Sequence, residues 1–167
     1  MNEKRLHDSA KVSQMMRMHA LDEIDLAMLR QLRLDARMSN AALAAAVGLS
    51  PSACLRRVQD LERRGVIRGY RAVIDPAQVG IGFAAYVTVG LRSHTRDAQE
   101  AFERAVARAP EVRECHNVTG TVEYLLRVEC ADLAAYKRFH SETLGTSPGV
   151  TALTTYVVMG SPKDERA

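Results

Sequence analysis

Arginines are concentrated in one short stretch of this chain of 167 residues. Residues 50–71 hold six arginines and two acidic residues, whereas residues 82–167 hold ten basic and eleven acidic ones. The six are Arg56, Arg57, Arg63, Arg64, Arg68 and Arg71. A guanidinium group neutralises phosphate and can bond guanine bidentately in the major groove. The local excess of positive charge is therefore what we expect of a surface that binds DNA.

The sequence around these arginines predicts two short helices joined by a tight turn. Ser39 can cap the first helix, and Gly48 suits the left-handed residue at its end. Ser50 can cap the second helix, and Pro51 fits the first position because no backbone N–H is needed there. Four apolar residues at helical spacing are expected to face inward, namely Cys54, Leu55, Val58 and Leu61. This order of elements predicts a helix-turn-helix.

Residues at the start, on the outer side and just beyond the second helix form the predicted DNA-binding set. They are Ser50, Ser52, Ala53, Arg56, Arg57, Arg63, Arg64 and Arg68. A plain helical hairpin with a solvated arginine face is the alternative interpretation. The flanks favour DNA binding, because residues 20–37 predict an amphipathic helix, capped by Asp22, that completes a three-helix core. Residues 65–74 alternate like a strand, which suits a β-wing. The predicted partner is double-stranded DNA.

A different pattern follows a hinge predicted at residues 76–82, where proline and two glycines accompany a drop in charge. Beyond it the periodicity predicts the order β-α-β-β-α-β, the split βαβ arrangement of ferredoxin-like domains. The predicted strands cover 83–91, 112–118, 122–130 and 150–159, with helices over 95–109 and from 132. We therefore expect an α+β chain with a winged helix-turn-helix domain at 20–75 and a ferredoxin-like domain at 83–160. Residues 1–19 and 161–167 are expected to be tails.

Several classes of protein are disfavoured by what the sequence lacks. No apolar run approaches the ~20 residues of a membrane span, and residues 1–20 carry charges throughout, unlike a signal peptide. Cys54, Cys115 and Cys130 form no C-x-x-C pair, and Cys54 and Cys130 are expected to be small core residues in a reducing cytoplasm. Nucleotide-binding glycine motifs, hydrolase nucleophile motifs and metal-ligand spacings do not occur. We therefore expect a cytoplasmic protein that is not an enzyme and has no catalytic residues, metal or cofactor.

Several short motifs follow one another along residues 20–160. They are Val47-Gly48-Leu49-Ser50-Pro51 with Arg56-Arg57-Val58, Thr119-Gly120 with Glu123-Tyr124, Pro148-Gly149-Val150, and Thr155-Tyr156-Val157-Val158-Met159. In this order and spacing they resemble the Lrp/AsnC family, also called feast/famine regulators. The resemblance implies a DNA-binding transcriptional regulator whose ferredoxin-like domain forms homodimers through its sheet. It also implies that dimers assemble into octamers or other even oligomers, with a small amino-acid effector bound between dimers.

The resemblance also implies an effector-binding set in the second domain. It comprises Asn117, Thr119, Gly120, Thr121, Glu123, Tyr124, Leu133, Tyr156, Val157 and Val158. A glycine turn offers backbone N–H groups to a carboxylate, and Glu123 can meet an ammonium group. Tyr124 and Leu133 would shape a side-chain pocket. Many family members carry an acidic residue where this chain has Thr121, and we expect a small or aliphatic amino acid because Glu114 and Glu123 would repel a second carboxylate.

Three alternatives stay open on the sequence alone. Gly120, Thr121 and Glu123 could belong to a plain hairpin with solvated polar residues. The fold also suits a small enzyme or metabolite-binding module, with the N-terminal helices as a dimer arm. A DNA-architectural protein without an effector would bind DNA equally well but respond to no amino acid.

Overall fold

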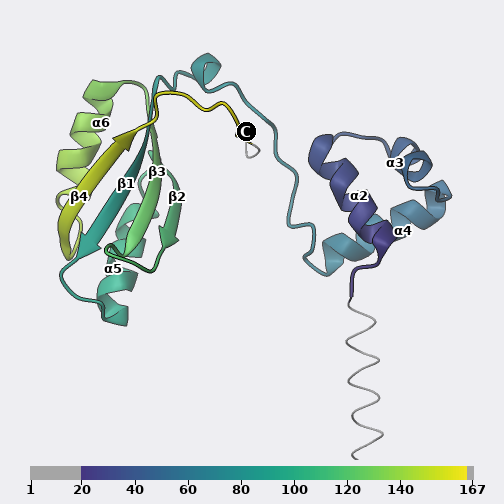
Figure 1. Ribbon diagram of the computed structural model, residues 1–167, viewed down its shortest axis with the longest axis horizontal. Coiled ribbons are helices and arrows are strands. Elements are labelled where there is room, and N and C mark those ends of the chain that lie inside the picture. Colours follow the sequence, from purple (N-terminus) through teal and green to yellow (C-terminus); the bar gives the residue numbers. More distant parts are fainter. Residues whose placement is uncertain (1–19, 165–167) are drawn as a thin grey trace, which may run out of the picture. The chain divides into compact units, whose positions relative to one another are not determined.

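The computed structural model describes residues 20–164, and the chain divides into two compact units (Figure 1). One unit ends at Ala72 and the other begins at Val73. Each has its own cluster of buried apolar residues, so each is described by itself.

Between residues 20 and 72, the N-terminal unit contains three helices. They are α2 (Glu23–Leu34), α3 (Asn40–Ala46) and α4 (Pro51–Arg63). α3 and α4 begin at the predicted caps, where the Ser39 and Ser50 hydroxyls accept hydrogen bonds from the backbone N–H of Ala42 and Ala53. Gly48, at φ +69°, makes the turn between the two helices in a conformation that glycine adopts without steric cost. The predicted helix-turn-helix is confirmed.

A small apolar core lies between the three helices. Its buried members are Met28, Leu43, Ala44 and Cys54, so every helix contributes to it. Cys54 has no exposed surface, as predicted. The prediction that Leu55 also faces inward is wrong, because its exposed fraction is 47%. Successive residues of a helix are separated by about 100°, and Leu55 is rotated off the core-facing side that Cys54 occupies.

The strand predicted over residues 65–74 is absent from the structure. After α4 the chain turns at Gly65, whose φ is +69°, and the following segment pairs with no other strand within residues 20–164. Val73 and Ile74 are 75% and 57% exposed. Apolar alternation alone cannot make a strand where no partner supplies the second half of the hydrogen-bond ladder. The predicted hinge contains a 3₁₀ turn over Pro76–Val79.

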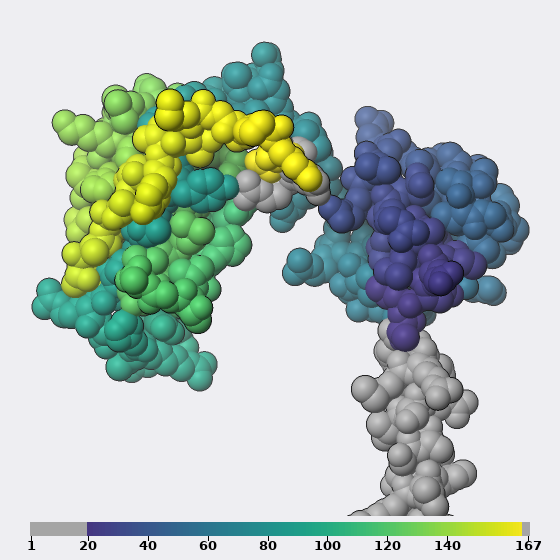
Figure 2. Space-filling model, viewed as in Figure 1, coloured from purple at the N-terminus to yellow at the C-terminus, as the bar shows by residue number. Residues whose placement is uncertain are grey.

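The C-terminal unit follows the predicted order β-α-β-β-α-β. Its elements are β1 (Phe83–Leu91), α5 (Arg96–Val106), β2 (Val112–Asn117), β3 (Tyr124–Cys130), α6 (Leu133–Phe139) and β4 (Val150–Val157). A π-helical turn over His140–Leu144 continues α6. The sheet order is β2-β3-β1-β4 with all pairs antiparallel, which confirms the ferredoxin-like architecture. β4 forms one sheet edge and lies at the surface of the unit (yellow in Figure 2).

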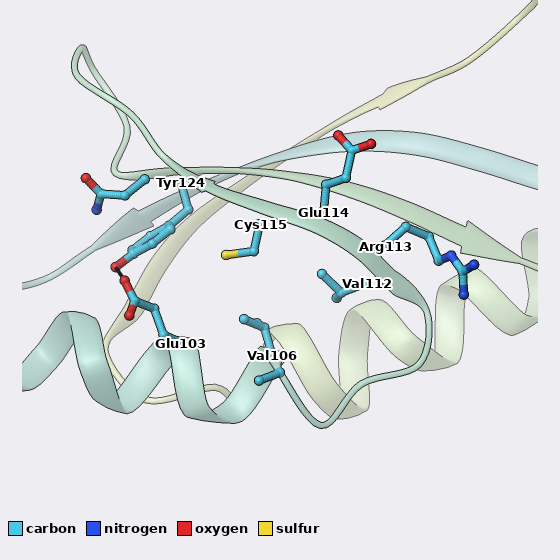
Figure 3. A pocket seen from close by; sticks show the side chains of 9 residues that line it. Glu103, Val106, Val112, Arg113, Glu114, Cys115 and Tyr124 are labelled. Carbon is cyan, nitrogen blue, oxygen red and sulfur yellow. Dashed lines mark hydrogen bonds between the residues drawn. The ribbon is translucent and has the colours of Figure 1, made fainter. Parts of the chain in front are cut away.

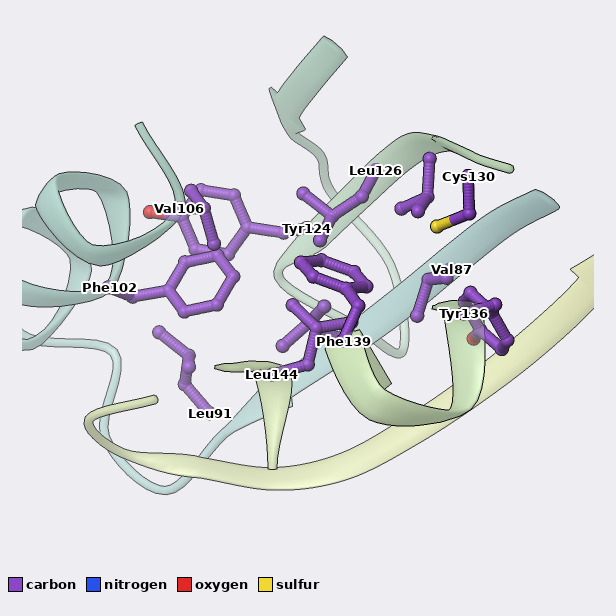
Figure 4. Packing of buried hydrophobic residues seen from close by; sticks show 12 residues of the cluster. Val87, Leu91, Phe102, Val106, Tyr124, Leu126, Cys130, Tyr136, Phe139 and Leu144 are labelled. Atoms are coloured by element: carbon purple, nitrogen blue, oxygen red, sulfur yellow. The ribbon is translucent and has the colours of Figure 1, made fainter. Parts of the chain in front are cut away.

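Both helices pack on one face of this sheet (Figure 4). Alternate residues of β1 and β3 are buried, as period-two side-chain alternation requires. The core combines these with Phe102 and Val106 of α5 and with Tyr136 and Phe139 of α6. Cys130 is also buried there, as predicted. The opposite face of the sheet carries no helix from residues 73–164 of the same unit (Figure 1).

Several predicted boundaries shift by a few residues. β3 begins at Tyr124 rather than at 122, because Val118 N–H donates to the Glu123 carbonyl and closes a turn before the strand. α5 ends at Val106, and β4 ends at Val157. The Val158 N–H still donates to the Ala84 carbonyl, so pairing with β1 continues one hydrogen bond beyond the end of β4.

Candidate functional sites

The start of α4 is fixed by two polar contacts. The Ser50 hydroxyl caps the helix and lies 3.3 Å from the Ser52 hydroxyl. Asn40 Nδ2 donates to the Pro51 carbonyl at 2.7 Å and so joins α3 to the first turn of α4. Sequence reasoning missed Asn40, although it directly follows the Ser39 cap. Ser52 is exposed, and Ala53 is half-buried at the exposed start of the helix.

The predicted DNA-binding arginines differ in whether acidic side chains already contact them. Arg56 is exposed and makes no hydrogen bond or ion pair with any residue between 20 and 164. Arg63 and Arg64 both contact Asp60, and Arg64 Nη1 lies 3.1 Å from its Oδ2. The hydrogen bond from Arg64, together with both positive charges, holds the pKa of the Asp60 carboxyl below its usual range. Exposed ion pairs of this kind are weak, so Arg63, whose side chain is 75% exposed, remains available to phosphate.

Arg57 is placed differently from its neighbour. Its Nη1 lies 2.8 Å from Asp22 Oδ2 and 2.7 Å from Asp25 Oδ1, and its side chain is 33% exposed. The sequence suggested an exposed arginine on the outer side of α4. The carboxylates that hold it lie more than thirty residues earlier in the chain, where helical periodicity cannot reveal the pairing. Arg68 lies in the exposed segment that follows α4.

The turn between β2 and β3 presents free backbone donors. Thr119, Gly120 and Thr121 are exposed, and Gly120 has a φ of +145° with open space where a side chain would begin. Val118 and Glu123 use their N–H groups within the fold. Within residues 20–164, the N–H groups of residues 119–122 donate no hydrogen bond. Successive N–H groups of this kind form a concavity that attracts anions.

Glu123 is fixed at one side of this turn. Its Oε2 accepts a hydrogen bond from the Leu91 N–H at 2.6 Å, and its Oε1 lies 3.1 Å from His94 Nδ1. The Glu123 side chain is only 13% exposed, whereas that of His94 is 77% exposed. His94 is a site residue that sequence reasoning missed, because it lies on the β1–α5 loop, far from the motif. The carboxylate is therefore preorganised, with one oxygen covered by a displaceable side chain.

Tyr124 points away from this exposed turn. It has no exposed surface, its hydroxyl donates to Glu103 Oε1 at 2.7 Å, and its ring lies 4.7 Å from that of Phe102. Burial, followed by the hydrogen bond to Glu103, raises the pKa of Tyr124 to about 12. The sequence suggested that Tyr124 shapes an effector cleft, but strand alternation places its side chain on the helix-covered face.

A cavity of about 300 Å³ lies between α5 and β2 (Figure 3). Glu103 and Tyr124 line it together with Asn117, the first residue of the predicted effector set. Cys115 is an exposed residue, but its thiol points into this cavity. Burial and the nearby Glu103 carboxylate raise the pKa of this thiol to about 11, so it is protonated and unreactive at neutral pH.

The remaining predicted effector residues lie away from the turn, at the start of α6 and along and just after the edge strand β4. Leu133, Tyr156 and Val157 are 65%, 58% and 54% exposed, and Val158 is half-buried. Tyr156 pairs with Tyr86 near the start of β1, whereas the turn adjoins the end of β1. Tyr156 lies about three residues along β1 from the level of Tyr124, at ~3.3 Å per residue, and β4 lies two strand spacings of ~4.8 Å from β3. One subunit therefore does not bring them together.

An open groove of about 690 Å³ adjoins this second group. Leu133, Tyr136 and His140 line it from α6 and the turn that follows, and Thr155 lines it from β4. The Tyr136 hydroxyl lies 2.5 Å from Thr155 Oγ1 and closes its floor. Leu133 gives the groove an apolar rim, which suits an aliphatic group.

Two features are absent from the described residues, a metal-binding cluster and a membrane-spanning helix. Between 20 and 164 no group of three histidine, cysteine or acidic side chains could hold a metal ion. None of the helices in that part of the chain is long and apolar enough to span a membrane.

Comparison with known proteins assigns both units. Residues 84–167 match the profile of the Lrp/AsnC ligand binding domain, and residues 21–68 match a winged helix-turn-helix DNA-binding domain. The chain is also 42% identical over 143 residues to the leucine-responsive regulatory proteins of Escherichia coli K12 and Salmonella typhimurium LT2, which covers 86% of this chain and 87% of theirs. The chain belongs to the Lrp/AsnC family. It is a DNA-binding transcriptional regulator, and because this family is not enzymatic, the small-enzyme alternative is wrong. Regulators of this family are oligomeric.

Solved structures of Lrp/AsnC regulators have the same fold. A Neisseria meningitidis transcriptional regulator in complex with L-methionine superposes with a TM-score of 0.82 at 36% identity, covering 87% of this chain and 94% of that one. An AsnC family regulator from Agrobacterium tumefaciens gives a TM-score of 0.81 at 34% identity, covering 86% and 94%.

Proposed function

We propose that this Lrp/AsnC regulator reads DNA with the exposed start of α4 and binds a small amino acid at the turn between β2 and β3. The effector then alters assembly and, through it, DNA binding. The observation that carries the effector site is the run of unused backbone N–H groups at residues 119–122 beside the fixed carboxylate of Glu123. A regulator of this kind acts in the cytoplasm, where DNA and free amino acids meet.

The DNA-reading surface centres on Ser52, Ala53 and Arg56. Small residues at the start of a recognition helix allow close approach to base edges, and a free arginine can bond guanine. Arg63 and Arg68 lie further along the chain and reach phosphates, while Ser50 and Arg64 are largely engaged within the fold. Arg56→Ala is expected to weaken binding by about 1–3 kcal/mol if Arg56 contacts a base.

The effector's carboxylate is placed on the N–H groups around Gly120. Its ammonium then takes the position of His94 beside Glu123 Oε1, so that two opposite charges are met by two matched groups. The L-methionine bound to the Neisseria relative supports an amino acid with an apolar side chain. Thr121, which carries no charge, adds no partner for a basic effector.

Two copies of the chain complete this site. The turn joins β2 and β3, while Leu133 and residues 156–158 lie on α6 and at the β4 edge with β1 in between, so the apolar wall is supplied by another subunit. A pocket built between dimers exists only in the larger oligomer. Binding there shifts the assembly equilibrium, because the ligand prefers the state in which the pocket is complete.

Dimers are proposed to form through the sheet face that carries no helix. Tyr86, Leu125 and Tyr156 project from this face, and Tyr86 pairs directly with Tyr156. A two-fold dimer also matches the symmetry of palindromic DNA sites. Higher even oligomers, such as octamers, follow from contacts between dimers.

Calorimetry of the full chain with each of the twenty amino acids tests the effector site. We expect one or more small or aliphatic amino acids to bind the wild type and Glu123→Gln to lose that binding, since the ammonium would lose its charge partner. Glu142→Gln removes an exposed carboxylate outside the site and should bind as the wild type does. Absence of binding to the wild type, or equal binding by Glu123→Gln, would contradict the site.

A further inference from the structure

The guanidinium of Arg57 bridges α4 to the start of α2. A single nitrogen, Nη1, donates to Asp22 at 2.8 Å and to Asp25 at 2.7 Å. The side chain of Asp25 is only 9% exposed, and that of Asp22 is half exposed. These three residues, called the arginine clamp below, form a polar contact between the first and third helices beside the Met28–Cys54 core.

The two carboxylates need this cation. Asp22 Oδ1 accepts the Asp25 N–H at 2.7 Å, and Asp25 Oδ2 accepts the Asp22 N–H at 3.2 Å, so the capping box uses one oxygen of each. The other oxygens both face Arg57. Removing the guanidinium would leave two like charges close together, one of them largely buried, which is costly.

The pKa values agree with this geometry. The hydrogen bond from the Asp25 backbone N–H, together with Arg57, holds the pKa of the Asp22 carboxyl below its usual value. Hydrogen bonds to Asp22 and Asp25 raise the pKa of Arg57 further above its already high value. Both shifts mean that the charged, paired state is the stable one.

Arg56 provides a contrast one residue away. It is exposed and has no partner among residues 20–164, so it can reach DNA without breaking any contact. Nη1 of Arg57 could reach a phosphate only by leaving both carboxylates, which also already neutralise its charge. Adjacent arginines on one recognition helix therefore have different capacities to contact DNA.

We propose that Arg57 is a positioning residue for DNA binding: the arginine clamp fixes the orientation of α4 against α2, and Arg57 itself contacts neither base nor phosphate. Cys54 and Val58 fix the apolar side of α4, and the clamp fixes its rotation about that side. Base readout depends on this orientation, because the reading side chains must meet base edges within hydrogen-bond distance. Arg57, which the sequence predicted to bind DNA, thus acts by orienting the side chains of α4 that read the bases.

Two measurements distinguish a positioning role from direct contact with DNA. One is the salt dependence of binding, and the other is whether replacing a clamp carboxylate weakens or tightens binding. The probe is a duplex that the wild-type chain enriches from a random-sequence pool, and its dissociation constant is measured for the full chain over a series of KCl concentrations. The variants are Arg57→Ala, Arg57→Lys, Asp25→Asn, the Asp25→Asn/Arg57→Ala double variant and Arg56→Ala. Circular dichroism confirms that each is folded.

Positioning predicts a specific pattern. Arg57→Ala should lose about fivefold or more in affinity while the slope of log K against log salt stays unchanged, because no phosphate contact is lost. Asp25→Asn should also weaken binding, although it removes a negative charge from a DNA-binding unit. The double variant should bind no more weakly than Arg57→Ala alone, and Arg57→Lys should restore only part of the affinity, since lysine cannot reproduce the guanidinium geometry. Arg56→Ala should reduce the slope by about one if it meets a phosphate.

Direct contact predicts the reverse. A salt slope that falls by about one in Arg57→Ala, with tighter binding by Asp25→Asn, would overturn the proposal. If Asp25→Asn does not fold, Asp22→Asn decides, because asparagine remains a good helix cap while the charge is removed. Weaker binding by Asp22→Asn supports the clamp, and tighter binding rejects it. Asp60→Asn is the matched control: it removes a negative charge beside the exposed Arg63 and should tighten binding.

Discussion

The two units of this regulator are stabilised in different ways. The N-terminal unit has four residues in its buried apolar cluster, and its helices depend on side-chain caps and on the arginine clamp. The C-terminal unit buries twelve residues between a sheet and two helices. Polar groups at its rim, namely Glu123 Oε1 and the N–H groups of residues 119–122, lie outside this core and are the ones proposed to meet a ligand.

This difference has a functional consequence. In the N-terminal unit a charge pair helps to hold the fold, so the same arginine is not free to bind DNA. In the C-terminal unit apolar packing holds the fold, and His94 covers the candidate ammonium position without a structural role that the core requires. Stability and binding thus compete for side chains in the small unit and are separated in the large one.

The largest effect is expected in the C-terminal core. Phe102 is fully buried against Tyr124, and Phe102→Ala should cost about 3–5 kcal/mol because it removes apolar contacts and leaves a cavity. Urea unfolding followed by circular dichroism gives the magnitude, and hydrogen exchange assigns it to residues 83–157. Leu34→Ala, at an 83% exposed position, is the control and should change stability by less than about 0.5 kcal/mol. A comparable loss in both variants would remove the contrast between core and surface.

The arginine clamp should give the next effect, confined to the N-terminal unit. Arg57→Ala should cost about 1–3 kcal/mol, less than for a fully buried pair because a third of the side chain is exposed. The lowered pKa of Asp22 means that its contribution is present above the usual carboxyl pKa and is lost as the pH falls through the lowered value. Wild-type stability should therefore fall below about pH 4, and Arg57→Ala should reduce that dependence. Hydrogen exchange of residues 23–63 across this pH range measures it, and an equal acid response in both proteins would contradict the clamp.

Short-range signals account for what the sequence predicted well. Caps, glycine turns and period-two burial depend on neighbouring residues, so Ser39, Gly48 and Ser50 and the four strands could be placed from sequence. The clamp, the His94–Glu123 contact and the Tyr124–Glu103 hydrogen bond join residues that are distant in the chain and carry no periodic signal. The missing wing strand has the same cause, because pairing requires a second segment that alternation within residues 65–74 does not specify.

The candidate-site residues were likewise predictable from sequence only where the signal is local. The β2–β3 turn was recognisable because its glycine and its acidic residue are local. The sequence could not indicate that Tyr124 faces the core while Leu133 and Tyr156 lie on α6 and on the edge strand β4. Only strand register and helix placement decide which side chains share a face.

A smaller effect is expected where the large unit uses a buried polar pair. Tyr124→Phe should cost about 0.5–1.5 kcal/mol, since it removes the hydrogen bond to Glu103 and keeps the ring. The pKa of Tyr124 is raised to about 12, so its contribution is present below the usual tyrosine pKa and is lost as the pH rises toward 12. Stability of the wild type should fall more steeply than that of Tyr124→Phe above about pH 10. Thermal unfolding at a series of alkaline pH values tests this, and parallel curves would show that Tyr124 ionises freely.

The smallest effect should come from the rim of the large unit, where binding and stability are separated. Thr121 is exposed two residues before Glu123, and Thr121→Asp would bring a second carboxylate near the proposed ammonium position. An exposed charge pair contributes about 0.2–1 kcal/mol, so the affinity for the bound amino acid should rise by a few-fold at most. Thermal unfolding without ligand should not change, because the side chain has no contact that the fold requires. Calorimetry at low and high salt measures the gain, which should shrink as salt screens the charge. Thr121→Asn is the matched control, with similar size and no charge, and should bind as the wild type does. Weaker binding by Thr121→Asp would mean that the new carboxylate faces the effector's own carboxylate, and the proposed orientation of the amino acid would then be reversed.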